Sequence, residues 1–177
     1  MGTPDRPRAV LLPGLRYPTH APLLWFSREV ALARGYEVVE LREPPPRDGD
    51  PFAWLRERAA RLLGERPSEG DVVIGKSLGS EAAGLVAERG LRAIWLTPLL
   101  DRESVLAGLA AAQRPALLVG GTADPTWRPQ ALPAERPQLT LLELDGLDHA
   151  LQRPGDPLAS LEALRAVTER IERFLAR

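Results

Sequence analysis

Two kinds of segment alternate along the chain: short runs of β-branched and other apolar residues, and longer stretches in which apolar residues recur every three or four positions. Runs of the first kind are typical of buried strands, and stretches of the second kind are typical of amphipathic helices. The pattern predicts strands at residues 9–12, 37–41, 71–74, 93–96, 116–120 and 139–144. It predicts helices at residues 22–34, 52–63, 80–89, 104–112 and 157–176. This alternation indicates an α/β fold, in which a parallel sheet is covered by helices on both faces and joined by right-handed crossovers.

Residues 75–79, Gly-Lys-Ser-Leu-Gly, follow the third predicted strand and fit two catalytic patterns. As Gly-x-Ser-x-Gly they form a nucleophile elbow, in which a sharp turn between a strand and a helix presents Ser77. Counted from Gly70, the same segment is Gly-x-x-x-x-Gly-Lys-Ser, the pattern of a phosphate-binding loop. Such a loop needs its strand before the first glycine, whereas here the strand 71–74 lies between the two glycines. The order of the segments favours the elbow over the phosphate-binding loop, and a plain glycine-rich turn is the structural alternative.

Two residues beyond later strands could complete a catalytic triad with Ser77. A serine hydroxyl needs a base to take its proton, and the base needs an acid to orient it. His149, one of two histidines, follows the strand 139–144, and Asp124 follows the strand 116–120. Each also has an ordinary explanation, since the aspartate could simply form a turn and the histidine could cap the last helix.

The choice of the acid leaves an alternative open. Asp101 also follows a predicted strand, at residues 93–96, but Asp124 is preferred. Asp148 adjoins His149 in sequence and is a poor orienter, because neighbouring residues of a loop seldom aim their side chains at each other. Asp145 is expected to shape that loop instead.

With serine, aspartate and histidine in this order, each just after a strand, the chain resembles the α/β-hydrolase superfamily from about residue 9 onward. The resemblance implies Ser77 as the nucleophile, His149 as general base and then acid, and Asp124 as the residue that orients the imidazole. It also implies six parallel strands in the order 2-1-3-4-5-6. In that order strands 1 and 3 lie side by side, and ligands bind in the crevice above them.

The resemblance further implies an oxyanion hole made of two backbone amides. One is the amide after the nucleophile, that of Leu78, at a helix N-terminus where the helix dipole helps. The other belongs to the loop after the first strand, where Leu15 is the candidate. That loop begins with Pro13 in place of the histidine that is common in the family. The side chain that supports the loop therefore differs, but the backbone N–H of Leu15 is still available.

No lid is expected, because residues 97–103, where many members of the superfamily insert one, form only a short link. A shallow, open site favours small esters, thioesters or activated amides over long lipids. Tyr17, Leu99 and Trp127 are expected in the wall of the pocket. Lys76, the only lysine of the chain, either contacts the substrate or faces solvent or an acidic neighbour.

Composition narrows the class of protein further. A chain of 177 residues has room for one core, so a single domain over residues 1–177 is expected. The net charge of −1 gives no electrostatic footprint for nucleic acid or for an anionic membrane. Cysteine is absent, no residue cluster suggests a metal or cofactor, and the apolar runs are too short to cross a bilayer. A cytoplasmic location is the expectation.

The sequence therefore predicts a small serine hydrolase that forms an acyl-enzyme on Ser77 and needs no cofactor. Two alternatives keep the fold. The same triad could transfer the acyl group to an acceptor other than water, or the protein could bind ligands without turnover. The phosphate-binding loop would instead predict stabilisation by Mg-ATP.

Overall fold

A computed structural model describes residues 6–176 of the chain. At its centre lies one sheet of six strands in the order β2-β1-β3-β4-β5-β6, which confirms the expected order. The strands are β1 Arg8–Leu12, β2 Glu37–Glu40, β3 Val72–Lys76, β4 Arg92–Leu96, β5 Ala116–Gly121 and β6 Leu139–Leu144. Every neighbouring pair is parallel, so the carboxyl ends of all the strands meet at one edge of the sheet.

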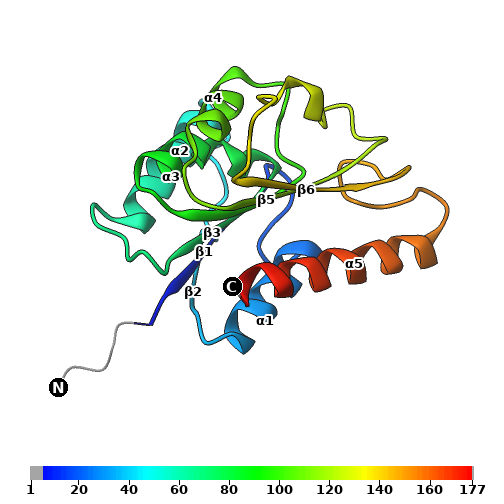
Figure 1. Ribbon diagram of the computed structural model, residues 1–177, viewed down its shortest axis with the longest axis horizontal. Coiled ribbons are helices and arrows are strands. Elements are labelled where there is room, and N and C mark those ends of the chain that lie inside the picture. Colours follow the sequence, from blue (N-terminus) through cyan, green and yellow to red (C-terminus); the bar gives the residue numbers. More distant parts are fainter. Residues whose placement is uncertain (1–5, 177) are drawn as a thin grey trace.

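Helices cover both faces of the sheet, as expected. Helices α1 and α5 pack together on one face, and α2, α3 and α4 lie on the other (Figure 1). The α-helices are α1 Pro22–Ala33, α2 Pro51–Leu63, α3 Ala83–Glu88, α4 Glu103–Ala111 and α5 Pro157–Leu175; two short 3-10 helices are η1 Ser77–Ala82 and η2 Pro129–Ala131. In the part of the chain that the structure describes, no helix combines the length and the apolar character needed to cross a membrane.

The strands divide the core into two apolar clusters, one on each face of the sheet. In β3, Val73 packs in the cluster under α2, α3 and α4, whereas Val72 and Ile74 pack in the cluster under α1 and α5. Because successive side chains of a strand point to opposite faces, Lys76 at the end of β3 shares the face of Val72 and Ile74. The sheet therefore directs this lysine inward, toward the α1 and α5 side.

The segment from Gly70 to Ser77 is a turn followed by a strand. Gly70 lies in the turn, and β3 continues through Gly75 and Lys76, which pair with residues of β4. The predicted strand 71–74 was therefore two residues too short at its end. A phosphate-binding loop needs backbone amides that are free to surround a ligand, and here they are used in the sheet. The interpretation as a phosphate-binding loop is wrong.

After β3 the chain winds first as the 3-10 helix η1 and only then as α3, where the sequence predicts one helix over residues 80–89. The hydroxyl of Ser80 donates to the Ser77 carbonyl oxygen at 2.7 Å. Serine side chains that bond to nearby backbone in this way compete with the regular helical pattern, which accounts for the difference.

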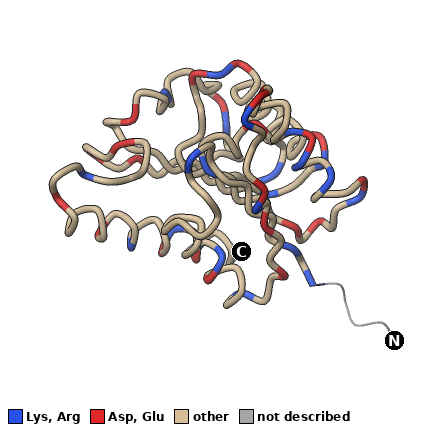
Figure 2. The backbone as a smooth tube through the Cα atoms, turned by 180° about the vertical axis from the view of Figure 1, so that it is seen from behind, with Lys and Arg blue, Asp and Glu red and all other residues tan. Residues whose placement is uncertain are grey.

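Charged residues of both signs are interspersed over the helices and loops (Figure 2). On α2, Arg61 pairs with Glu57 one turn earlier, and on α5, Arg165 pairs with Glu169 one turn later. Such exposed pairs contribute little to stability but balance the charge within each helix.

Candidate active site

Ser77 lies where β3 ends and η1 begins, and its backbone is in the left-handed region, with a φ of 50°. This conformation is uncommon for a residue with a side chain, and it is the strained turn that a nucleophile elbow requires. Close contacts require the glycines on either side. A Cβ on Gly75 would lie 2.6 Å from the Trp95 ring, and one on Gly79 would lie 2.7 Å from the Leu12 carbonyl oxygen. The motif thus folds as the sharp strand-to-helix turn that its pattern predicts.

The imidazole of His149 lies between Ser77 and Asp124. Its Nε2 is 2.8 Å from Ser77 Oγ, and its Nδ1 is 2.7 Å from Asp124 Oδ2. The three residues follow β3, β5 and β6, so the carboxyl edge of the sheet brings them together. Asp101, the alternative acid, is exposed in the turn before α4, and no hydrogen bond within residues 6–176 joins it to His149. The side chain that meets the imidazole is that of Asp124.

The carboxylate of Asp124 is fully buried. Its Oδ1 accepts hydrogen bonds from the backbone amide of Thr126 at 2.9 Å and from the Thr126 hydroxyl at 2.8 Å. Burial raises the pKa of Asp124, but the hydrogen bonds from His149 and Thr126 outweigh it and hold the pKa below its usual 3.8. Sequence analysis missed Thr126; the signal is a hydroxyl side chain two residues after an aspartate, a common turn arrangement.

The loop after β6 is shaped by its two aspartates. Asp148 Oδ1 accepts from the amides of Ala150 and Gln152, at 2.8 and 2.9 Å. Asp145 Oδ1 accepts from the hydroxyl of Thr122 at 3.1 Å. Asp148 is thus occupied with the loop backbone rather than with the imidazole, in agreement with the expectation for both residues.

The two residues expected to supply oxyanion-binding amides, Leu78 and Leu15, both lie close to Ser77. Leu78 is the second residue of η1, where N–H groups have no acceptor within the helix. Gly14 and Tyr17 bond to each other through their backbones, which leaves Leu15 at the tip of a tight turn. A Cβ on Gly14 would lie 3.5 Å from Ser77 Cβ, so this turn lies against the serine. Within residues 6–176 the Leu15 amide donates to no other group.

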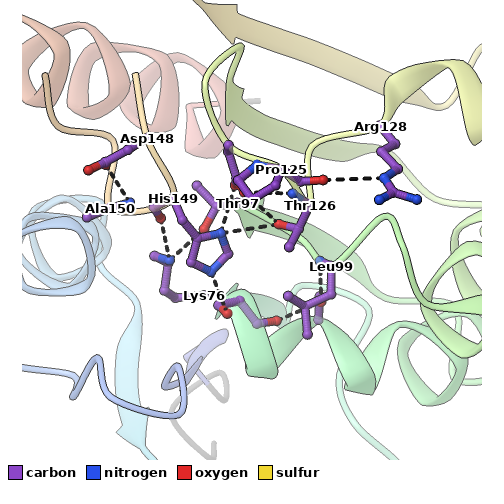
Figure 3. Close-up of polar contacts among 12 residues, drawn as sticks. Lys76, Thr97, Leu99, Pro125, Thr126, Arg128, Asp148, His149 and Ala150 are labelled. Atoms are coloured by element: carbon purple, nitrogen blue, oxygen red, sulfur yellow. Dashed lines mark hydrogen bonds and ion pairs between the residues drawn. The ribbon is translucent and has the colours of Figure 1, made fainter. Parts of the chain in front are cut away.

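The Lys76 side chain passes beneath the loop that carries His149 (Figure 3). It is 1% exposed, and its Nζ donates to Thr97 Oγ1 at 2.5 Å and to the His149 carbonyl oxygen at 2.9 Å. The side chain therefore lies behind the histidine, shielded from solvent and, among residues 6–176, without an acidic group in hydrogen-bond contact, and Lys76 is also among the residues that line the cleft. The expectation that Lys76 faces solvent or an acidic neighbour is therefore wrong, and contact of this residue with a substrate stays a prediction.

Tyr17 forms part of the cleft wall, as expected. Its hydroxyl accepts a hydrogen bond from the Leu23 amide at 3.0 Å, at the start of α1. Burial raises the pKa of Tyr17, and the bond from Leu23 partly opposes the change. The phenol therefore stays neutral and holds the turn after β1 against α1.

Leu99 and Trp127, the other two expected wall residues, lie away from the cleft. Trp127 is 7% exposed and packs on β5, where a Cβ on Gly120 would lie 2.0 Å from its ring. Its Nε1 donates to Glu143 Oε2 at 2.7 Å. Leu99 is half-buried against the core under α2, α3 and α4, and its amide donates to Ser80 Oγ at 3.1 Å. Both are packing residues, because the segments after β4 and β5 turn these side chains toward the core.

A cleft of about 530 Å³ opens beside the triad. Residues 14–17 form one wall, and the loops after β5 and β6 form the other with Ala123, Pro125 and Ala150. This volume is in the range of small-molecule sites. The link from β4 to α4, residues 97–102, is too short to form a lid. Within residues 6–176, no cluster of three or more histidine, aspartate or glutamate side chains is arranged to hold a metal ion.

Comparison with known proteins identifies the fold. No family model and no curated protein matches the chain. Est1E from Butyrivibrio proteoclasticus, solved with ferulic acid bound, has a TM-score of 0.68 at 15% identity, over 98% of this chain and 90% of its own. A serine hydrolase without a lid from Xanthomonas campestris has a TM-score of 0.65 at 20% identity, over 100% and 88%. A monoacylglycerol lipase from Paleococcus ferrophilus has a TM-score of 0.61 at 18% identity, over 98% and 96%.

One of these similar structures is named as an α/β serine hydrolase without a lid, and the strand order of this chain is the one expected from the resemblance. The chain has the α/β-hydrolase fold in a form without a lid. At these identities the similarity establishes the fold, and the chemistry has to be argued from the residues at the edge of the sheet.

Proposed function

We propose that the protein is a serine hydrolase that cleaves small esters or related acyl compounds through an acyl-enzyme on Ser77. The observation that carries the proposal is the continuous hydrogen-bonded chain from Ser77 Oγ through His149 to Asp124, with bonds of 2.8 and 2.7 Å. A hydroxyl with a base and an oriented acid in line is the arrangement that activates serine. Similar folds include esterases and a lipase, which agrees with this chemistry.

In the first half-reaction, Ser77 Oγ attacks the carbonyl carbon of the substrate, and His149 Nε2 takes the hydroxyl proton. The negative charge that develops on the carbonyl oxygen is stabilised by the amides of Leu78 and Leu15. The carboxylate of Asp124, which is ionised because its pKa is low, stabilises the imidazolium through Nδ1. The tetrahedral intermediate then collapses, and His149 gives its proton to the leaving group.

In the second half-reaction, His149 takes a proton from water, and the resulting hydroxide attacks the acyl carbon on Ser77. The same amides stabilise the second tetrahedral intermediate, and the proton on His149 Nε2 returns to Ser77 Oγ as the acid leaves. An alcohol or amine in the place of water would give acyl transfer by the same steps. Analysis of the products with added alcohol or amine separates the two outcomes.

The size and lining of the cleft favour a small acyl compound. A volume of about 530 Å³ suits a small molecule, and Leu15, Tyr17, Pro125 and Ala150 give the walls a mainly apolar surface. Within the described residues 6–176, no lid encloses the cleft to hold a long chain. Short esters, thioesters and activated amides are therefore the first substrates to screen.

Labelling with a fluorophosphonate probe tests the proposal, because the probe reacts with an activated serine whatever the natural substrate is. Wild type is expected to be labelled, and Ser77→Ala and His149→Ala are expected to lose the label. Ser68→Ala, which removes an exposed serine in the turn before β3, is the matched control and should keep it. A folded wild type that is not labelled would contradict hydrolysis and point to a non-catalytic binding protein.

A further inference from the structure

Lys76 is the only buried cationic side chain among residues 6–176. None of the ion pairs formed by these residues includes it. A buried ammonium without an ionic partner is unfavourable unless strong hydrogen bonds compensate for the loss of water. The groups in contact with the Lys76 ammonium should therefore show which interactions compensate for its charge.

The ammonium has three N–H donors, and three groups surround it. Thr97 Oγ1 accepts at 2.5 Å, the His149 carbonyl oxygen accepts at 2.9 Å, and the centroid of the Tyr17 ring lies 5.1 Å from Nζ. The bonds to Thr97 and His149 are visible in Figure 3. Hydrogen bonds from an ionised donor are roughly twice as strong as neutral ones, and a cation near an aromatic face adds to them. The lysine thus joins β3, the residue after β4 and the histidine loop.

The loop that carries the imidazole is attached to the ends of other strands at two points. On the upstream side, the Ala123 amide donates to the Leu147 carbonyl oxygen at 3.0 Å, which fixes the loop to the end of β5. At His149 itself, the attachment is the bond from Lys76 to the carbonyl oxygen. The first attachment is a neutral backbone bond, and the second depends on a charge.

We propose that Lys76 is a positioning residue whose ammonium, while protonated, holds the backbone of His149 and so keeps the imidazole aligned between Ser77 and Asp124. This inference rests on the proposed function, because alignment matters only if His149 moves protons. Misplacement of a catalytic group by about 1 Å can slow a reaction on the order of 100-fold. The ammonium acts through the histidine and not on the substrate.

The charges around Lys76 set the pH at which the attachment weakens. Burial lowers the pKa of Lys76 to about 8, and the negative charges of Asp124 and Asp148 partly oppose this effect. His149 and the phenol of Tyr17 are the other titratable groups that face it. Above about pH 8 the neutral amine makes weaker bonds to the His149 carbonyl. Activity is therefore expected to fall on the alkaline side.

The test compares wild type with Lys76→Met, which keeps the length of the side chain and removes both the charge and the donors. At neutral pH, kcat is expected to fall about tenfold while KM stays within about twofold, since the ammonium bonds to Thr97 and His149 and in our proposal not to the substrate. The alkaline decline near pH 8 is expected in wild type and absent in the variant. Thr97→Ala should shift the decline to lower pH, because it removes an acceptor of the ammonium, and Thr97→Ser should preserve it.

Because Lys76 is the only lysine, its Nζ gives a single lysine ammonium signal in ¹⁵N NMR, and the pKa can be measured without any substrate. The titration of that signal is expected to coincide with the alkaline decline in kcat. If Lys76→Met fails to fold, this measurement and the Thr97 variants still test the positioning role of Lys76.

The possible outcomes separate this inference from the proposed function. A labelled wild type whose Lys76→Met variant retains both kcat and the alkaline decline would overturn the positioning role alone. The positioning role would also be overturned if Lys76 stays protonated throughout the alkaline decline in kcat. A wild type that the fluorophosphonate never labels would overturn the proposed function and this inference with it.

Discussion

Two buried charged side chains flank Ser77 in sequence, and their surroundings are opposite. Glu81, four residues after the serine, is 0% exposed in its side chain and pairs with Arg56 and Arg102. Lys76, directly before the serine, has only two uncharged oxygen atoms as hydrogen-bond acceptors. The carboxylate is neutralised by neighbouring cations, whereas the ammonium is not neutralised by any direct partner.

This difference separates a charge that stabilises the fold from one that, in our proposal, stabilises a catalytic arrangement. Arg56 comes from α2 and Arg102 directly precedes α4, so Glu81 connects both helices to η1. Arg102 also lies 3.6 Å from the centroid of the Phe52 ring. Because each partner keeps some exposure, 46% and 35%, the network compensates the buried carboxylate without burying more charge. Because burial lowers the pKa of Lys76, its charge is expected to lower stability at neutral pH and, in our proposal, contributes to alignment instead.

The largest expected effect concerns Asp124, the carboxylate that both orients His149 and raises the pKa of Lys76 from a distance. Asp124→Asn is expected to lower kcat on the order of 10³- to 10⁴-fold, because the amide favours the wrong tautomer of the imidazole. The pKa of Lys76 should also fall further below about 8, which the ¹⁵N signal of the single lysine measures. A kcat within about tenfold of wild type, in a variant with an unchanged circular dichroism spectrum, would assign the orienting role to another group.

The next prediction concerns the stability of wild type against Lys76→Met as pH rises. The folded pKa of Lys76 is about 8 and its usual value is 10.5, so between these values the unfolded chain binds more protons than the folded one. Stability must then increase with pH, and the penalty at neutral pH corresponds to roughly 3 kcal/mol. Urea unfolding from about pH 7 to pH 10.5 is expected to show wild type gaining this amount relative to Lys76→Met.

This gain in stability would coincide with the loss of activity expected over the same pH range. A residue that merely stabilises the fold would make both quantities fall together. If the difference in the free energy of unfolding between wild type and Lys76→Met stays constant with pH, the charge of Lys76 is not the group that titrates. The contrast between a compensated buried charge at Glu81 and an uncompensated one at Lys76 would then no longer hold.

Glu81→Gln tests the other half of the comparison. The variant keeps the shape of the side chain but loses the charge that pairs with Arg56 and Arg102, and it is expected to lose about 2 kcal/mol of stability. The matched control is Glu57→Gln on α2, where the pair with Arg61 is exposed and the expected loss is at most about 0.5 kcal/mol. Urea midpoints at unchanged m-value measure both. Equal losses in the two variants would mean that burial does not distinguish these carboxylates.

Much of the fold could be predicted because it depends on local patterns. The apolar runs and helical periodicities place all six strands and the main helices, and the resemblance supplies the strand order. Ser77, Asp124 and His149 could be found for a related reason. Each lies in the segment that follows a strand, and a parallel sheet brings such segments to one edge.

The position of Lys76 could not be predicted in the same way, because its partners come from loops after three other strands. One signal was available: a strand extended through residues 72, 74 and 76 directs all three side chains to the same buried face. Trp127 has a comparable signal in Gly120, since a glycine inside a strand often leaves room for a close neighbour. The direction in which the Trp127 side chain points, however, depends on the geometry of the turn after β5, which residue types alone do not determine.

The smallest expected effect concerns Thr126, whose hydroxyl donates to Asp124 at 2.8 Å and lies 3.2 Å from His149 Nδ1. Thr126→Val removes this bond but keeps the backbone bond to the same oxygen, so kcat is expected to fall about fivefold, equivalent to about 1 kcal/mol. The pKa of Asp124 should rise toward its usual 3.8. Because a depressed carboxyl pKa adds stability that is lost as pH falls through it, the variant should unfold at a higher pH in an acid titration than wild type. Thr168→Val on α5 makes the same chemical change far from the site, where the hydroxyl bonds the Leu164 carbonyl. An equal shift in this control would mean that the lost hydroxyl, and not its bond to Asp124, sets the acid limit.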